Sequence, residues 1–253
     1  MDSISIIRTP IESELEAFKE LYDSSLSSSN TLLDSVVAHI RQRSGKMMRP
    51  ILVLLVARLY GVVSPATLHA AVSLELLHNA SLVHDDVVDE STERRGQLSV
   101  NAIFNNKVAV LTGDYLLATS LVHAELTNSH QIIRLVSSLG QDLADGELLQ
   151  LSNVSNHSFS ETVYFDVIRK KTAALFAACT AAAAYSVGVS EEEVKLARLL
   201  GEYIGICFQI KDDIFDYFDS KEIGKPTGNV MLEGKLTLPV LYALNRANDN
   251  QAT

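Results

Sequence analysis

The chain has little cysteine, little proline and no tryptophan: 2 Cys, 5 Pro and 0 Trp among 253 residues. Cys179 and Cys207 stand in alanine-rich and aromatic surroundings without metal-ligand spacing, so we expect small buried side chains rather than a disulfide or a metal centre. A reducing cytoplasm fits this cysteine usage. Because the prolines and the 12 glycines cluster in short segments, long stretches remain without helix breakers.

Basic charge is also scarce, since 21 Lys and Arg stand against 31 Asp and Glu and give a formal net charge of −10. A face that binds nucleic acid needs surplus positive charge, so we expect no nucleic-acid partner. Charges interrupt the longest apolar runs before the roughly 20 residues of a membrane span, and the N-terminus lacks the pattern of a secretory signal. The protein should be soluble, and any phosphate must be held by metal and a few placed cations.

Apolar residues recur at helical spacing along most of the chain, whereas strand-like alternation is almost absent. With 47% hydrophobic residues, the sequence predicts one all-α domain over 1–253, a bundle of long antiparallel helices around a deep central cavity. We expect helices over 11–25, 30–43, 48–60, 66–92, 106–126, 130–153, 160–186, 190–218 and 236–246. Several exceed the average globular helix of about 11–12 residues.

Two aspartate clusters share one spacing: Asp85, Asp86 and Asp89, then Asp212, Asp213 and Asp216. Residues four apart lie on one helical face, and two carboxylates roughly 6 Å apart repel by about 3 kcal/mol at an effective dielectric of ~20. A solvated acidic face is the alternative, but leucine, valine and phenylalanine surround both clusters. Ligands that offer only oxygen suit Mg²⁺. Both clusters fall near the ends of predicted helices and would face each other across a cavity if these helices run parallel.

Basic residues recur in the segments near these clusters: Lys46, Arg49, Arg94, Arg95, Lys171, Lys211, Lys225 and Lys235. Taken singly, each is more typical of a surface residue. Together with two metal sites they favour recognition of a diphosphate, since an arginine fork binds oxygens in pairs and lysine supplies a point charge.

The sequence resembles the trans-polyprenyl diphosphate synthase family, in its long-chain, octaprenyl-type form. The matching stretches are GKMMRP (45–50), LLHNASLVHDDVVDESTERRG (76–96), NNKVAVLTGDYLLA (105–118), GE (146–147) with Gln150, KTAALF (171–176), FQIKDDIFD (208–216), and GKPTGN and EGKLTLP within 224–239. They keep the family's order and cover nearly the whole chain. The resemblance implies an isoprenoid synthase-type helical bundle and a prenyltransferase.

The resemblance also assigns roles. Asp85, Asp86, Asp89 and Arg94 would hold an allylic diphosphate through Mg²⁺, and Asp212, Asp213 and Asp216 would complete a set of three Mg²⁺ ions. Isopentenyl diphosphate would be bound by Lys46, Arg49, His78 and Arg95. The allylic substrate and its departing diphosphate would contact Lys171, Thr172, Gln209 and Lys225. By itself, His78 is more typical of a core histidine.

The implied reaction needs no protein nucleophile. Diphosphate leaves, an allylic carbocation forms, the isopentenyl double bond attacks it, and a proton is lost to the diphosphate. An apolar cavity would shield the cation from water. A homodimer is a family expectation, and the hydrophobicity of a long prenyl product predicts transient membrane contact during its release.

Product length is predicted from the helix before the first cluster. Ala80 and Ser81 are small where family members that make short products tend to carry aromatic residues, so a growing chain could pass and meet its limit deeper, at Leu77 and beyond. We expect a heptaprenyl to decaprenyl product, with octaprenyl as the central value.

The sequence departs from the family pattern at three sites. Ser44 and Met47 replace a usual glycine and arginine, and Val230 replaces a usual aspartate. Typical members continue through several more helices after the position of Thr253, so we expect a truncated chain, a shortened relative, or an assembly that covers the gap. Three alternatives stay open: a terpene cyclase, disfavoured by the second cluster, a subunit of a heteromeric synthase, and a short-chain farnesyl or geranylgeranyl synthase.

Overall fold

The computed structural model describes residues 3–42, 47–94, 96–155, 160–215, 217 and 237–246. Its elements are α1 (Ser3–Arg8), the 3-10 helix η1 (Thr9–Ile11), α2 (Glu12–Ser25), α3 (Thr31–Gln42), α4 (Met48–Tyr60), α5 (Pro65–Val88), β1 (Glu93–Arg94), β2 (Gln97–Leu98), α6 (Val100–Phe104), α7 (Asn106–Glu125), α8 (His130–Ser155), α9 (Glu161–Ile168), the π-helical turn η2 (Arg169–Ala173), α10 (Ala174–Ser186), α11 (Glu191–Phe215) and α13 (Leu238–Leu244). The all-α prediction is confirmed.

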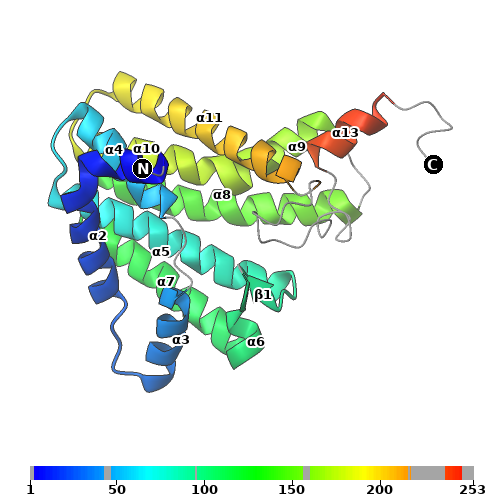
Figure 1. The fold of residues 1–253 in the computed structure, drawn as a ribbon, viewed down its shortest axis with the longest axis horizontal. Helices are drawn as coiled ribbons and strands as arrows, with labels where there is room; N and C mark the ends of the chain where they lie inside the picture. Colours follow the sequence, from blue (N-terminus) through cyan, green and yellow to red (C-terminus); the bar gives the residue numbers. More distant parts are fainter. Residues whose placement is uncertain are drawn as a thin grey trace.

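The long helices α5, α7, α8, α10 and α11 form the body of the molecule (Figure 1). Helix α5 packs along α7 and also contacts α4 and α10, while α11 packs mainly on α10. In Figure 1, α5 and α11 both run from the left of the view toward the right, so their C-terminal ends point the same way. The two cluster-bearing helices therefore run parallel, which is the condition for both clusters to face one cavity. No described helix is both long and apolar enough to cross a membrane.

Helix α5 has a well-defined start and end. The Ser64 side chain caps the first turn by accepting from the Thr67 amide, and Pro65 occupies the first helical position. The helix ends at Val88 rather than at the predicted residue 92. The side-chain amide of Asn101 donates to the backbone carbonyl oxygens of Asp86 at 3.2 Å and Ser91 at 3.1 Å. These two bonds hold the segment after Val88 away from the helix axis.

A two-stranded antiparallel hairpin follows α5 and was not predicted. Arg94 pairs with Gln97, and Gly96 in the turn has a φ of 73°, a left-handed conformation that favours glycine. Strands of two residues are too short to produce a detectable alternation. The hairpin returns Arg94 toward the end of α5.

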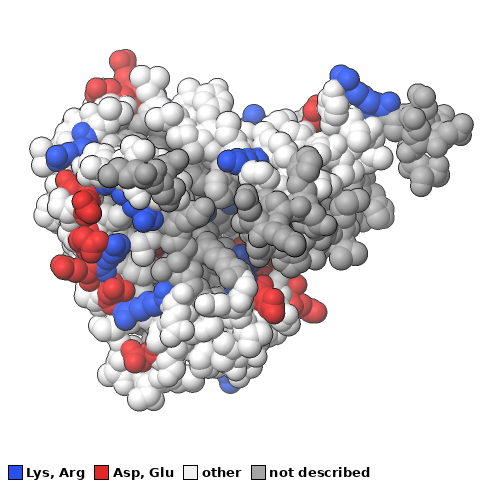
Figure 2. All heavy atoms as spheres, viewed as in Figure 1, with Lys and Arg blue, Asp and Glu red and all other residues white. Residues whose placement is uncertain are grey.

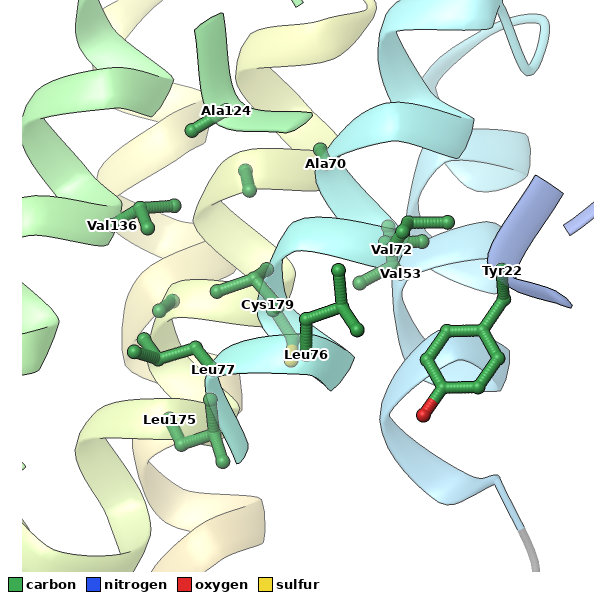
Figure 3. Packing of buried hydrophobic residues seen from close by; sticks show 14 of the residues in the cluster. Tyr22, Val53, Ala70, Val72, Leu76, Leu77, Ala124, Val136, Leu175 and Cys179 are labelled. Carbon is green, nitrogen blue, oxygen red and sulfur yellow. The ribbon is translucent and has the colours of Figure 1, made fainter. Parts of the chain in front are cut away.

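The core is built largely from α5 and the alanine-rich α10, whose residues 175–184 are all buried. Leu76 and Leu77 of α5 and Leu175 and Cys179 of α10 lie in the same part of this core (Figure 3). Cys207 is exposed on α11, so the expectation of a buried side chain was wrong for this residue. Gly201 and Gly205 turn one face of α11 toward α10, and Cys207 falls on another face.

Candidate active site

The second aspartate of the first cluster is held by the hairpin. Asp86 is 1% exposed, and its Oδ1 lies 2.5 Å from Nε of Arg94 on β1. Because an unpaired buried carboxylate would be costly, this ion pair stabilises both the end of α5 and the start of the hairpin. The structure therefore brings together Asp86 and Arg94, two of the candidate site residues.

The first aspartate of this cluster, Asp85, lies among several charges. Burial raises the pKa of Asp85 to about 6, a shift opposed by Lys171 and Arg94 and increased by Glu147 and Asp89. Asp85 lies on α5 and Asp89 directly after it, and the other neighbours come from α8, η2 and β1, so four elements converge here. The surplus of carboxylate oxygens around Asp85 fits a hard divalent cation such as Mg²⁺.

The π-helical turn η2 carries Lys171 and Thr172 into this region. Lys171 forms an ion pair with Glu147 of α8. The close approach depends on Gly146, because a Cβ there would lie 2.9 Å from Cβ of Lys170 and 3.2 Å from the backbone nitrogen of Lys171. Single π-helical turns within longer helices are frequent at functional sites, where they reorient side chains.

The second cluster is joined to η2 by hydrogen bonds. Oγ1 of Thr172 donates to Oε1 of Gln209 at 2.7 Å, and Nε2 of Gln209 donates to Oδ1 of Asp213 at 2.8 Å. The hydroxyl of Tyr164 on α9 donates to the other carboxylate oxygen of Asp213 at 2.5 Å. Asp213 is 6% exposed. Adjacent residues of η2 therefore link to the two clusters: the charge of Lys171 acts on Asp85, and Thr172 is hydrogen-bonded through Gln209 to Asp213.

Two glycines set the distance between α11 and the elements beneath it. A Cβ at Gly205 would lie 2.6 Å from Cα of Ala173, and a Cβ at Gly201 would lie 2.8 Å from Cα of Ala177. Gln209 is one helical turn beyond Gly205, so it shares this face. The close packing places Gln209 within reach of Thr172.

The remaining charges do not form a single-sign field on the face shown in Figure 2, where Lys and Arg side chains lie beside Asp and Glu side chains. Within the described parts of the chain, no three His, Cys, Asp or Glu side chains could hold a metal ion by themselves. A cation bound at Asp85 would thus take further ligands from a phosphate or from water, as Mg²⁺ commonly does.

The family model described as polyprenyl synthetase matches residues 30–253. The chain belongs to the polyprenyl synthetase family. Membership makes it a trans-prenyltransferase, in agreement with the prediction from sequence.

Relatives of this polyprenyl synthetase differ in their named products. Heptaprenyl diphosphate synthase component 2 of Geobacillus stearothermophilus is 39% identical over 239 residues, 93% of this chain and 74% of the relative. The geranylgeranyl pyrophosphate synthase from Bacteroides thetaiotaomicron, known from a crystal structure, is 76% identical in sequence to this chain. The two structures superpose with a TM-score of 0.84 over 98% of this chain and 75% of that one.

A third relative carries bound ligands. The polyprenyl synthase of Caulobacter crescentus, complexed with calcium and isoprenyl diphosphate, is 33% identical and has a TM-score of 0.93, covering 99% of this chain and 76% of that one. This likeness confirms the all-α isoprenoid synthase fold.

Other predicted residues of the polyprenyl synthetase lie as follows. Arg49, in the first turn of α4, has its guanidinium 5.3 Å from the ring centroid of Phe176, and His78 is buried in α5. Ala80 and Leu77 are buried in the core, and the partly buried Ser81 donates to the His78 carbonyl at 2.9 Å.

Four predicted site residues lie outside the described residues: Lys46, Arg95, Asp216 and Lys225.

Sequence reasoning missed Tyr164 and gave Glu147 no role. Tyr164 precedes Lys171 by seven residues, but the π-helical turn η2 begins between them, so α-helical spacing does not place the two side chains on one face. An aromatic residue within an apolar helical stretch is more typical of a core position, so only its hydroxyl distinguishes it. Glu147 stood within a matched stretch, but its ion pair with Lys171 depends on the packing of α8 on η2.

Proposed function

We propose that the chain elongates an allylic diphosphate by successive head-to-tail condensation with isopentenyl diphosphate, in a Mg²⁺-dependent reaction that releases diphosphate. The convergence of Asp85, Lys171 and the Thr172–Gln209–Asp213 hydrogen bonds supports this proposal most directly. Both clusters are thereby linked to the π-helical turn η2, the first through the charge of Lys171 and the second through the hydrogen bonds of Thr172. The relative with bound calcium and isoprenyl diphosphate agrees with a divalent cation.

Each group has a distinct task in this proposal. Mg²⁺ would be held by the carboxylates of Asp85, Asp86, Asp89, Asp212, Asp213 and Asp216, with three ions as the expected number. When bound, it supplies positive charge to the departing diphosphate. Lys171 exchanges its partner Glu147 for a diphosphate oxygen, and the ion pair Asp86–Arg94 keeps the first cluster in place.

The isopentenyl diphosphate would be bound by Arg49, His78, Lys46 and Arg95, and Lys225 would act on the allylic diphosphate. These assignments derive from the family resemblance. Thr172 and Gln209, which are already hydrogen-bonded to each other, would contact the allylic group near its reacting carbon. The buried leucines and alanines of α5 and α10 would exclude water from the carbocation.

We propose a long-chain product, heptaprenyl to decaprenyl with octaprenyl as the central value. Ala80 and Ser81 offer little bulk one turn before Asp85, and the Geobacillus relative is named for a heptaprenyl product. The Bacteroides relative, at 76% identity, is named for geranylgeranyl diphosphate and favours the shorter alternative. Chromatography of dephosphorylated products decides between them, since a dominant geranylgeranyl product would contradict the long-chain proposal.

A homodimer is the proposed assembly. Val110, Leu111, Leu121 and Val122 of α7 are 40%, 60%, 43% and 55% exposed. Residues 11 apart lie close to the same helical face, so these side chains form an apolar stripe that a second copy could cover. The Geobacillus relative is named as one component of its enzyme, which favours a heteromeric alternative.

The test of the function uses the chain alone with isopentenyl diphosphate, farnesyl diphosphate and Mg²⁺. We expect turnover that stops when a chelator removes the metal, and light scattering should give the mass of a dimer. Turnover that appears only after a second, different subunit is added would support the heteromeric alternative. A chain with no turnover under either condition would contradict the proposal.

A further inference from the structure

The hydrogen bonds around Asp213 have directions that their chemistry fixes. An ionised carboxylate only accepts, so the hydroxyl of Tyr164 and the amide NH₂ of Gln209 must both donate to it. The amide oxygen of Gln209 then faces Thr172, and the Thr172 hydroxyl must donate to it. A series of hydrogen bonds thereby runs from the Tyr164 hydroxyl on α9 through Asp213 and Gln209 on α11 to Thr172 on η2.

Packing alone does not explain the hydroxyl of Tyr164. The ring is buried, 8% exposed, in a small apolar cluster with Ile168 and Leu241, and it lies edge-on to Phe165 with centroids 5.4 Å apart. A phenylalanine would fill the same space without a polar atom that needs a partner. The contact that tyrosine adds is the hydrogen bond to Asp213.

We propose that Tyr164 is a positioning residue for prenyl transfer. Its hydroxyl holds the carboxylate of Asp213, the carboxylate holds the amide of Gln209, and the amide directs the hydroxyl of Thr172 beside Lys171. The carboxylate keeps lone pairs for further ligands, so this role is compatible with a metal ion at the second cluster. The inference rests on the proposed function, because its kinetic consequence is an effect on the allylic substrate.

The first test is Tyr164→Phe, with Tyr185→Phe as the matched control. Tyr185 also donates its hydroxyl to a carboxylate, Glu191 at 3.2 Å, at the other end of α10. We expect kcat to fall about 10- to 100-fold in Tyr164→Phe, while the KM for isopentenyl diphosphate stays unchanged. This is the usual loss when a residue that orients an active-site group is removed. Tyr185→Phe should retain kcat within about twofold. Equal kcat in wild type and Tyr164→Phe would overturn the inference.

A double-mutant cycle with Asp213→Asn separates positioning through Asp213 from a general structural effect. In the Asp213→Asn background, Tyr164→Phe should lower kcat by no more than about twofold, because the residue through which it acts is already changed. A full additional 10- to 100-fold loss would show that Tyr164 acts by another route, and would overturn the proposal.

A spectroscopic measurement tests the hydrogen-bond chain without any activity. The side-chain amide signals of Gln209, assigned by comparison with Gln209→Glu, should shift in ¹⁵N–¹H spectra of Tyr164→Phe and remain in place in Tyr185→Phe. Should Tyr164→Phe fail to fold, Asp213→Asn alone should shift the same signals. Unchanged Gln209 signals would overturn the inference. A wild-type protein without transferase activity would instead contradict the proposed function. The spectra would still report on the hydrogen bonds among Tyr164, Asp213 and Gln209.

Discussion

The contact between α11 and η2 can be tested by adding one methyl group at Gly205. A Cβ at this position would lie 2.6 Å from Cα of Ala173 and 3.0 Å from Cβ of Ala173, so backbone must move to accept it. Gln209 lies one turn farther along the same face and forms the 2.7 Å bond to Thr172. Gly205→Ala should therefore reduce both stability and activity.

The magnitude follows from two opposing terms. Replacing a helical glycine by alanine gains about 1 kcal/mol in helix propensity. Overpacking a close helix contact costs about 1–3 kcal/mol, and here the clash is with backbone, so the upper half of that range applies. The net loss in unfolding free energy should be about 1–2 kcal/mol. A shift of roughly 1 Å at Gln209 would lower kcat about 100-fold.

Urea unfolding and initial rates measure both effects, and Gly140→Ala is the control. Gly140 lies within α8, and a Cβ there would meet nothing within 4 Å. Its replacement should raise the unfolding free energy by about 0.5–1 kcal/mol and leave the rate unchanged. If Gly205→Ala proved as stable and as active as Gly140→Ala, the packing argument for the site would be refuted.

Three further predictions concern a buried ion pair, a histidine pair and the product. Arg94→Met should lower the unfolding free energy, measured by urea titration, by about 2–3 kcal/mol. This loss is smaller than for a fully buried pair because the Arg94 side chain is 29% exposed. An unchanged unfolding midpoint would show that the burial of Asp86 does not require Arg94. Burial, assisted by the neighbouring His69, lowers the pKa of His123 to about 4, so stability is fully present above about pH 6.5 and is lost as pH falls toward 4. Urea titrations from pH 7.5 to 4.5 should show a weaker pH dependence in His123→Asn, and equal slopes would contradict this assignment. Ala80→Tyr should shorten the prenyl product in chromatography, whereas an unchanged product distribution would reject a tunnel that passes this residue.

The sequence was most informative where the pattern repeats or is long. Uninterrupted helical periodicity predicted the all-α fold, and the matched spacing of the two clusters singled out Asp85 and Asp212 as candidate site residues. Both signals depend on spacing along one helix, which the sequence contains directly.

Features that depend on contacts between elements were not predictable. The hairpin after α5 depends on Asn101 binding the carbonyls of Asp86 and Ser91, which local pattern does not specify. In the sequence, Tyr164 resembles an ordinary core aromatic. Its hydrogen bond to Asp213 was not predictable because the two residues are 49 positions apart. The exposure of Cys207 follows from which face of α11 meets α10, and the sequence does not show that Gly201 and Gly205 mark this contact.

Binding of inorganic diphosphate, measured by titration calorimetry with and without Mg²⁺, tests the central claim most directly. If both aspartate clusters act on one diphosphate, binding should require Mg²⁺ and should be weakened at least about tenfold by Asp85→Asn and, separately, by Asp212→Asn. Diphosphate affinity that is unchanged in either variant, or equal with and without Mg²⁺, would contradict a shared metal-dependent site.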